Sequence, residues 1–287
     1  MSASNASIHP DTTVGKVALT VPDLDRSVPF YQQVVGLQLH KREAGTAILG
    51  AGGQQEIVEL SEDANARPAR STTGLYHLAI RVSSRLELAR ALRRLVEAQY
   101  PPQGFADHLV SEAIYLADPD GNGIEIYRDR DRSEWPYRNG QLQMATDPLD
   151  VQGLLAELES ETGLPAYVDP ATNLGHVHLQ VNQIPQAEAF YCDVLGFELV
   201  TRYGPSASFV SAGGYHHHIG FNTWNSAGAP SPPPGSTGLR YFSVLLPHLE
   251  ELERVAGRVR SADIPTEETD NGLLVYDPAG NGVLLTV

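Results

Sequence analysis

The chain carries the same strand-and-helix pattern twice, and this internal repeat limits the folds that it can adopt. Short alternating strands are predicted at Lys16–Val21 and His176–Val181, which lie 176 − 16 = 160 residues apart. A Phe-Tyr pair opens a helical pattern at Phe30–Leu37 and again at Phe190–Phe197, and 190 − 30 gives the same 160. Each copy ends its helix with a glycine that suits a left-handed cap. The repeat predicts two copies of one strand–helix pattern, aligned without a gap.

A second repeat interleaves with the first. The turn Asp118–Gly123 matches Asp277–Gly282, at an offset of 277 − 118 = 159 residues. Both are Pro/Gly/Asn turns between two apolar strands, so they predict hairpins. Ahead of them lie the strand patterns Gly74–Ile80 and Gly238–Val244, each followed by a helical pattern.

The two interleaved repeats divide the chain into four βαβββ modules and predict an α+β fold. The modules lie near residues 14–62, 72–130, 174–226 and 237–287. We expect a first domain at 14–130, a second domain at 174–287, and between them a polar connector, 131–173, with a short helix after Asp150.

The acidic balance of the chain argues against nucleic-acid and membrane-surface partners. With 20 Lys+Arg against 35 Asp+Glu, the formal net charge is −15, which repels phosphate backbones and anionic lipid. The nearest basic cluster is formed by Arg90, Arg93 and Arg94, and its helical spacing is typical of a solvated helix face.

Targeting and membrane-spanning segments are not expected either. The polar stretch Met1–Thr13 lacks the basic start and apolar core of a signal peptide. No apolar run approaches the roughly 18 residues that cross a bilayer. These features predict a cytoplasmic protein.

The single cysteine, Cys192, excludes an intrachain disulfide and a Cys-rich zinc site. It follows Phe190 and Tyr191 in the helical pattern of the third module. We therefore assign it a structural role.

These motifs resemble the vicinal oxygen chelate superfamily, which includes glyoxalase I, fosfomycin resistance enzymes and extradiol ring-cleaving dioxygenases. The resemblance rests on Phe-Tyr-x-x-Val at Phe30–Leu37 and on Asp-Pro-Asp-Gly-Asn-Gly-Ile-Glu at Asp118–Glu125. The segments Gly213–Gly220 and Asp107–Glu112 look typical of its two-domain catechol-2,3-dioxygenase-like members. The resemblance implies paired modules that form two curved mixed sheets, with a divalent metal on the concave face.

Strand alternation places three candidate metal ligands on one side of their strands. Ile124 and Ile126 are expected to face the helix-covered core, so Glu125 faces the other way. The same alternation directs His77 and His176 away from the helix-covered core. Two histidines and one carboxylate form a facial triad that leaves coordination positions open. The resemblance implies that His77, Glu125 and His176 are the metal ligands.

The triple-histidine segment offers a possible fourth ligand. Read as a strand, it places His216 and His218 on one face and His217 on the other. Either His216 or His218 is expected to contact the metal or the substrate, and His217 is assigned to packing.

The other two modules lack ligands at the matching positions. Lys16 stands where His176 stands, Tyr241 where His77 stands, and Leu284 where Glu125 stands (284 − 125 = 159). Modules one and four therefore look like scaffold. Because neither half of the chain holds the triad alone, we expect module two to pair with module three, and module one with module four.

The resemblance and the ligand set predict an extradiol dioxygenase that cleaves a catechol-type aromatic diol with O₂. We expect Fe(II), although Zn, Mn or Ni would also suit these ligands, because site geometry sorts such metals. Acid–base work on the substrate hydroxyl is assigned to four candidates. They are His108, Tyr115, which precedes Glu125 by ten residues, His178 and His218.

Two rival functions stay open at this stage. A glyoxalase-like isomerase or lyase typically uses a second Glu as ligand and base on the last strand of the partner module. In this chain that strand is predicted to carry histidines. A non-catalytic binding module of the same superfamily would lack metal ligands. The substrate's ring substituents and any homo-oligomeric state stay undetermined by the sequence.

Overall fold

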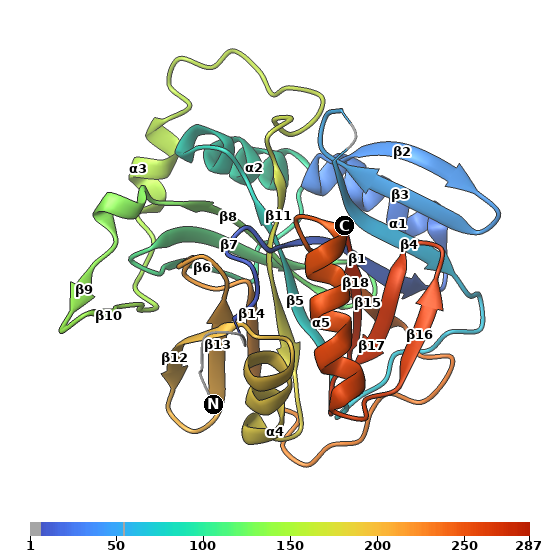
Figure 1. Cartoon of the computed structure of the whole chain (residues 1–287). Coiled ribbons are helices and arrows are strands. Elements are labelled where there is room, and N and C mark those ends of the chain that lie inside the picture. The colour runs from blue at the N-terminus through green and yellow to red at the C-terminus, as the bar shows by residue number, and fades with distance from the viewer. Residues whose placement is uncertain (1–6, 54) are drawn as a thin grey trace. The chain divides into compact units, whose positions relative to one another are not determined.

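The computed structural model describes residues 7–53 and 55–287 and confirms the four βαβββ modules (Figure 1). Module one comprises β1 (Thr13–Val21), α1 (Leu24–Phe30), the π-helix η2 (Tyr31–Val35), β2 (Gln38–Glu43), β3 (Thr46–Gly50) and β4 (Glu56–Glu62). Module two comprises β5 (Gly74–Arg81), α2 (Arg85–Glu97), β6 (Gly104–Asp107), β7 (Ser111–Ala117) and β8 (Gly123–Asp129).

The second half repeats this order of elements. Module three comprises β11 (Asn173–Gln180), α4 (Ile184–Glu188), the π-helix η4 (Ala189–Val194), β12 (Glu198–Tyr203), β13 (Ala207–Ser211) and β14 (Ile219–Asn222). Module four comprises β15 (Gly238–Leu245), α5 (Leu249–Ser261), β16 (Thr266–Thr269), β17 (Gly272–Tyr276) and β18 (Gly282–Thr286). The connector carries η3 (Arg132–Glu134), β9 (Tyr137–Arg138), β10 (Gln141–Leu142) and α3 (Val151–Ala156). Helix α3 is the short helix predicted after Asp150, whose side chain caps it.

The strands form two eight-stranded mixed sheets, which confirms the α+β class. Their strand orders are β12-β13-β14-β11-β5-β8-β7-β6 and β16-β17-β18-β15-β1-β4-β3-β2. Modules two and three thus share one sheet, and modules one and four share the other, as the distribution of candidate ligands predicted. The pairs β5·β8, β11·β14 and β15·β18 are parallel, whereas the hairpins β7·β8 and β17·β18 are antiparallel.

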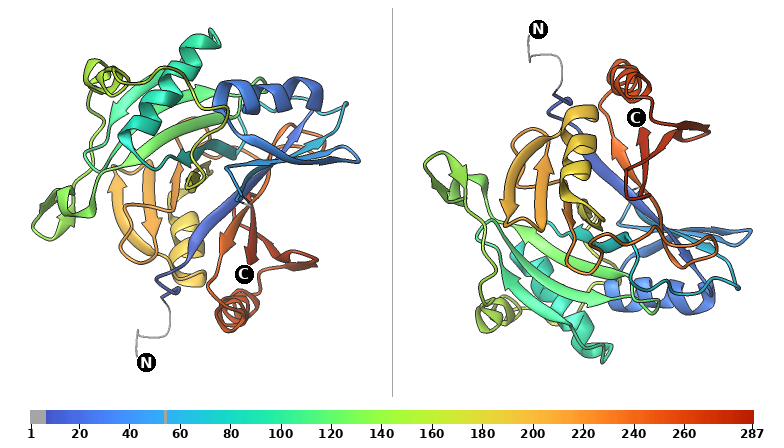
Figure 2. Two further views of the ribbon diagram at one scale, coloured as in Figure 1. Left: turned by 90° about the horizontal axis from the view of Figure 1, so that it is seen from above. Right: turned by 90° about the horizontal axis from the view of Figure 1, so that it is seen from below.

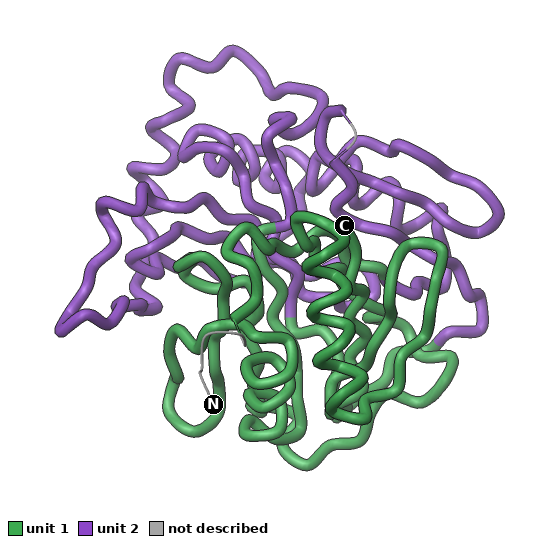
Figure 3. The backbone as a smooth tube through the Cα atoms, viewed as in Figure 1, with its two compact units in different colours: residues 1–18, 67–76, 175–287 green, residues 19–66, 77–174 purple. Residues whose placement is uncertain are grey.

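The chain divides into two compact units (Figure 3). Unit 1 holds residues 1–18, 67–76 and 175–287, and unit 2 holds residues 19–66 and 77–174. The domain boundaries expected from the sequence, 14–130 and 174–287, stay a prediction. Among the described residues, no helix has the length and apolar character needed to cross a membrane.

The Phe-Tyr motif ends its helix differently from the sequence expectation. A regular helical turn was expected, but both copies close as π-helices, in which the carbonyl of Tyr31 accepts from the N–H groups of Gly36 (3.0 Å) and Leu37 (2.9 Å). Gly36 and Gly196 then adopt the predicted left-handed conformation, with φ of 93° and 92°. A side chain would be strained there, which explains the glycine in each copy.

A tyrosine–aspartate pair ties the two interleaved repeats together in each unit. The buried hydroxyl of Tyr31 donates to Asp118 Oδ2 at 3.0 Å, and that of Tyr191 donates to Asp277 Oδ2 at 3.0 Å. Burial raises the pKa of Asp118, although its hydrogen bonds from Asn122 and Tyr31 act in the opposite direction. The Phe-Tyr helix of one module thus depends on the Asp-Pro turn of the next.

Helix α2 packs against β8 in unit 2 and also binds the connector (Figures 1 and 2). The sequence assigned its arginines to a solvated face, and that interpretation was wrong for two of them. Arg94 is buried and donates to the carbonyl of Pro165 at 3.1 Å, and Arg90 pairs with Glu161 at 2.6 Å. Their partners lie about 70 residues away along the chain (|i−j| = 71), where helical periodicity gives no information.

Candidate metal centre

His77 and Glu125 meet on the parallel strands β5 and β8. The register sets Ala79 opposite Glu125, and His77 Nε2 lies 3.0 Å from Glu125 Oε2. Both side chains are buried, with 6% and 2% of the residue exposed. Burying a carboxylate is costly unless a partner compensates for lost hydration. A compact buried imidazole–carboxylate pair of this kind is a suitable donor set for a cation.

His176 lies on β11 of unit 1 and is 2% exposed. Its ring centroid is 4.1 Å from that of His217 and 6.2 Å from that of His216. The imidazoles of His216 and His217 place further ring nitrogen atoms near the candidate ligand.

The triple-histidine segment is not a strand, which corrects the parity argument made for it. Strand β14 begins only at Ile219, and the turn before it contains Gly213 and Gly214 with φ of 59° and 67°. A Cβ on Gly213 would lie 2.2 Å from the carbonyl oxygen of Pro10. Because the backbone turns here, alternation does not decide which way the three histidines point.

The turn instead gives each histidine its own surroundings. His217, which the sequence assigned to packing, packs against His176 with its ring tilted by 53°, and its ring centroid lies 5.0 Å from that of Phe209. His216 Nδ1 lies 3.0 Å from His217 Nδ1, and His218 Nδ1 accepts from the N–H of Ala212 at 3.2 Å. His217 therefore packs beside the candidate ligand His176, and the Gly-Gly pair before the histidines was the available sequence signal for a turn.

His77, Glu125 and His176 form a group that could hold a metal ion. Each offers one ligand atom, and these atoms lie within 4.8 Å of one another. All three are buried, and two imidazoles with one carboxylate suit divalent iron, manganese or zinc. The donor chemistry therefore fits a divalent metal, as the sequence led us to expect.

The register also shows what replaces Glu125 elsewhere in the repeat. In module four, Ser243 faces Leu284 as Ala79 faces Glu125, so the ligand position carries a buried leucine. In module three, His178 faces Gly220 in the same way. The sequence had placed histidines on that strand, but the position equivalent to Glu125 is a glycine.

The ring of His178 covers Gly220. A Cβ on Gly220 would lie 3.2 Å from Cγ of His178 and 3.2 Å from Phe209. Asn222 Oδ1 accepts from the N–H of Trp224 at 3.0 Å, which turns its Nδ2 toward His178 Nε2, also at 3.0 Å. The amide therefore donates to Nε2, and a neutral His178 carries its proton on Nδ1.

His108 and Tyr115 form a hydrogen-bonded pair in unit 2. His108 Nδ1 lies 2.7 Å from the carbonyl oxygen of Ala145, and its Nε2 lies 2.7 Å from the Tyr115 hydroxyl. A carbonyl only accepts, so Nδ1 carries the proton and the neutral ring accepts from Tyr115 at Nε2. Tyr115 pairs opposite Glu125, and its ring centroid is 5.8 Å from that of His77.

With this geometry in place, comparison with known proteins assigns the family. The family model of the Glyoxalase/Bleomycin resistance protein/Dioxygenase superfamily matches residues 13–126 and 173–285. The chain belongs to this superfamily. The two matched stretches correspond to the two halves of the internal repeat.

Two relatives carry names that bear on chemistry. The chain is 48% identical over 287 residues to "Catechol-2,3-dioxygenase" of Bacillus subtilis (strain 168), covering 98% of this chain and 99% of that protein. It is 24% identical over 262 residues to "Manganese-dependent 2,3-dihydroxybiphenyl 1,2-dioxygenase" of Geobacillus genomosp. 3, covering 88% and 74%. Among solved structures, glyoxalase I from Zea mays matches with a TM-score of 0.59 at 16% identity, over 96% of this chain and 92% of that one. The last likeness bears on the fold alone.

Proposed function

We propose that this protein is an extradiol dioxygenase that cleaves a catechol-type aromatic diol with O₂. The observation that carries the proposal is the buried donor set of two histidines and one glutamate, with Gly220 where a second carboxylate would stand. The 48% identical relative named a catechol-2,3-dioxygenase supports the same substrate class. A glyoxalase-like isomerase, which typically uses that second carboxylate, is disfavoured by the glycine.

His77, Glu125 and His176 are the proposed ligands of the divalent ion. A bound Fe(II) or Mn(II) would supply open coordination positions for the diol and O₂ and a route for electrons between them. We propose Fe(II), and the manganese-dependent relative makes Mn(II) the alternative to test. His77 Nε2 and Glu125 Oε2 lie 3.0 Å apart, which is close enough for both atoms to coordinate one ion.

His108 and Tyr115 are the proposed acid–base pair. The Tyr115 hydroxyl donates to His108 Nε2 at 2.7 Å, and its oxygen can at the same time accept from a substrate hydroxyl. A substrate proton can thus reach His108 through Tyr115. General acid–base groups of this kind typically contribute about 10²- to 10⁴-fold to the rate.

His178 and His218 complete the proposed catalytic set. His218 Nδ1 accepts from a backbone N–H, so a neutral His218 carries its proton on Nε2 and can donate it to a substrate or oxygen atom. His178 is oriented by Asn222 in the opposite tautomer. We propose that the two histidines provide hydrogen bonds and proton exchange, while His217 packs beside the ligand His176.

The test is oxygen consumption with a panel of catechols under anaerobic metal loading. We expect about one divalent ion per chain, one O₂ consumed per diol, and a coloured ring-opened product. Isomerisation of a glutathione hemithioacetal, with no O₂ uptake on any catechol, would support the isomerase instead. A chain that binds the diols without metal and without turnover would be a binding module.

A further inference from the structure

The turn that carries His108 has an unusual backbone. It joins β6 to β7, and the next residue, Leu109, has a φ of 69°. Leucine rarely adopts this left-handed conformation, because its Cβ crowds the backbone. Such strain persists only where the surroundings fix the backbone.

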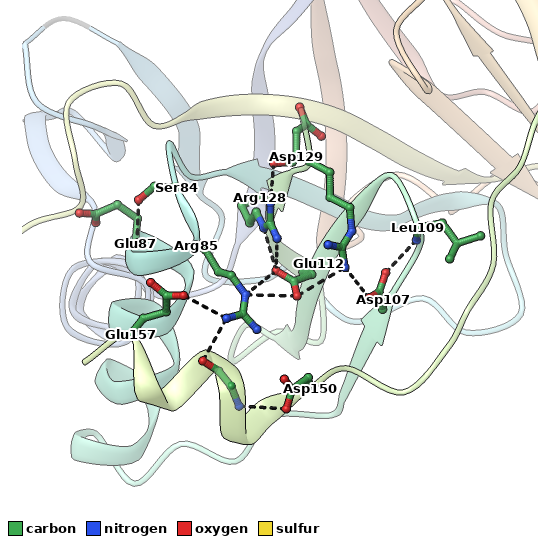
Figure 4. A network of polar contacts seen from close by, with 12 residues as sticks. Ser84, Arg85, Glu87, Asp107, Leu109, Glu112, Arg128, Asp129, Asp150 and Glu157 are labelled. Carbon is green, nitrogen blue, oxygen red and sulfur yellow. Dashed lines mark hydrogen bonds and ion pairs between the residues drawn. The ribbon is translucent and has the colours of Figure 1, made fainter. Parts of the chain in front are cut away.

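The carboxylate of Asp107 fixes this turn. Its Oδ1 accepts from the N–H of Leu109 at 2.9 Å, and its Oδ2 pairs with Arg130 at 2.5 Å. Arg130 in turn lies 3.6 Å from the buried Glu112, which also binds Arg85 (Figure 4). A series of ion pairs thus runs from Arg85 through Glu112 and Arg130 to Asp107. The carboxylate of Asp107 then binds the N–H of the strained Leu109.

The backbone of Asp107 also holds the connector. Its N–H donates to the carbonyl of Asp147 at 2.8 Å, and Asp147 returns an N–H at 2.9 Å. Two residues earlier, Ala145 supplies the carbonyl that accepts from His108 Nδ1. The same short stretch of connector thus sets the tautomer of His108, and Asp107 holds that stretch in place.

We propose that Asp107 is a positioning residue for His108. Its carboxylate holds the Leu109 N–H and so sets the direction of the His108 side chain, while the main chain at this position, which any residue would supply, bonds Asp147 beside the Ala145 carbonyl. This leaves Nε2 as the acceptor toward Tyr115. The inference rests on the proposed function, in which His108 receives a proton through Tyr115.

Three variants test the proposal. Asp107→Ala removes the acceptor for the Leu109 N–H and the partner of Arg130. Asp107→Asn keeps a carbonyl oxygen for the Leu109 N–H. The matched control is Thr269→Ala, in the β16–β17 turn of module four, where Thr269 Oγ1 accepts from the N–H of Asn271 at 3.2 Å.

In the metal-loaded enzyme, we expect Asp107→Ala to lower kcat about 10- to 100-fold, as misplaced catalytic groups do. The limb of the pH–kcat profile that reports His108 should shift, while metal content and KM stay close to wild type. Asp107→Asn should recover most of kcat, and Thr269→Ala should keep all of it. An unchanged kcat in Asp107→Ala, equal losses in the Ala and Asn variants, or a comparable loss in Thr269→Ala would overturn the proposal.

Amide hydrogen exchange separates this proposal from the proposed function. The peptide that covers Asp107–Glu112 should exchange faster in Asp107→Ala and at the wild-type rate in Asp107→Asn. If wild type cleaves no catechol, the proposed function fails, and hydrogen exchange still decides whether Asp107 holds the turn. Unchanged exchange in Asp107→Ala would overturn the positioning role even in an active enzyme.

Discussion

Modules two and four are built alike, yet only module two carries candidate metal ligands. In both, a parallel strand pair sets a small residue opposite the ligand position, Ala79 opposite Glu125 and Ser243 opposite Leu284. Each module also has, before its last strand, an Asp-Pro turn whose aspartate accepts from a buried tyrosine. The parallel strand pair and the Tyr–Asp hydrogen bond are thus present with both modules, whereas the candidate carboxylate ligand is present in module two and is replaced by leucine in module four. At this position the residue that breaks the repeat, Glu125 against Leu284, is the one proposed to act in the chemistry.

The largest expected effect is at the ligand position itself. Glu125→Ala should remove the bound metal and lower kcat by more than about 1,000-fold, because alanine cannot replace a charged ligand. Leu284→Ala at the matching position should leave metal content and kcat unchanged while lowering the free energy of unfolding by about 2–5 kcal/mol through the cavity it opens. Metal analysis, oxygen uptake and denaturant unfolding measure the three quantities. Full metal occupancy in Glu125→Ala would contradict the ligand assignment.

A smaller loss of unfolding free energy, similar in the two units, is expected when either tyrosine–aspartate hydrogen bond is removed. Tyr31→Phe and Tyr191→Phe should each cost about 1–3 kcal/mol, because each leaves a buried aspartate with one donor fewer. Urea unfolding measures both losses, and oxygen uptake per bound metal checks that catalysis survives. A loss in only one variant would break the equivalence of the two units.

The pH dependence of the Tyr31→Phe loss follows from Asp118. Burial holds the pKa of Asp118 above its ordinary value. The stability that the protonated carboxyl contributes is therefore fully present below the unfolded pKa of about 3.9, and this stability is lost as pH rises through the folded pKa. Removing the Tyr31 donor raises that pKa further. The destabilisation should therefore be larger at pH 7 than at pH 4, and an unfolding series across this range would detect the reverse order.

The smallest effect is expected at Cys192, which stands where the first copy has Gln32. Burial raises the pKa of the Cys192 thiol to about 11, so little thiolate is present at neutral pH. We expect slow alkylation of the native enzyme and fast alkylation after unfolding, followed by mass spectrometry. Cys192→Gln should change kcat by less than about twofold, as expected for an exchange between equivalent scaffold positions. Rapid native alkylation with loss of activity would instead place the thiol near the chemistry.

The sequence predicted much of this fold because its signals are local or periodic. The strand pairs, the left-handed caps at Gly36 and Gly196, and the parity of Glu125 all follow from neighbours in the chain. The surroundings of His216, His217 and His218 could not be predicted in this way. Gly213 and Gly214 turn the backbone, so the alternation of a strand does not apply to the three histidines.

The role of the connector was also beyond sequence reasoning. Arg94 reaches Pro165 and Asp107 reaches Asp147 across contacts that leave no periodic trace in the residues between them. The acceptors in these two contacts are backbone carbonyls, which every residue carries, so no residue type marks them. The candidate ligands could therefore be brought together from the sequence, but the groups that contact His108 could not.

The hydrogen bond between Tyr31 and Asp118 can form only after much of the chain has been synthesised. The two residues are 87 positions apart, so a nascent chain that ends before Asp118 has no acceptor for this hydroxyl. Contacts of such sequence separation form late, because the intervening loop must close first. We expect the first module to stay incompletely packed on the ribosome until the Asp-Pro turn of the second has emerged. Truncated nascent chains arrested on either side of Asp118 should then differ in resistance to protease.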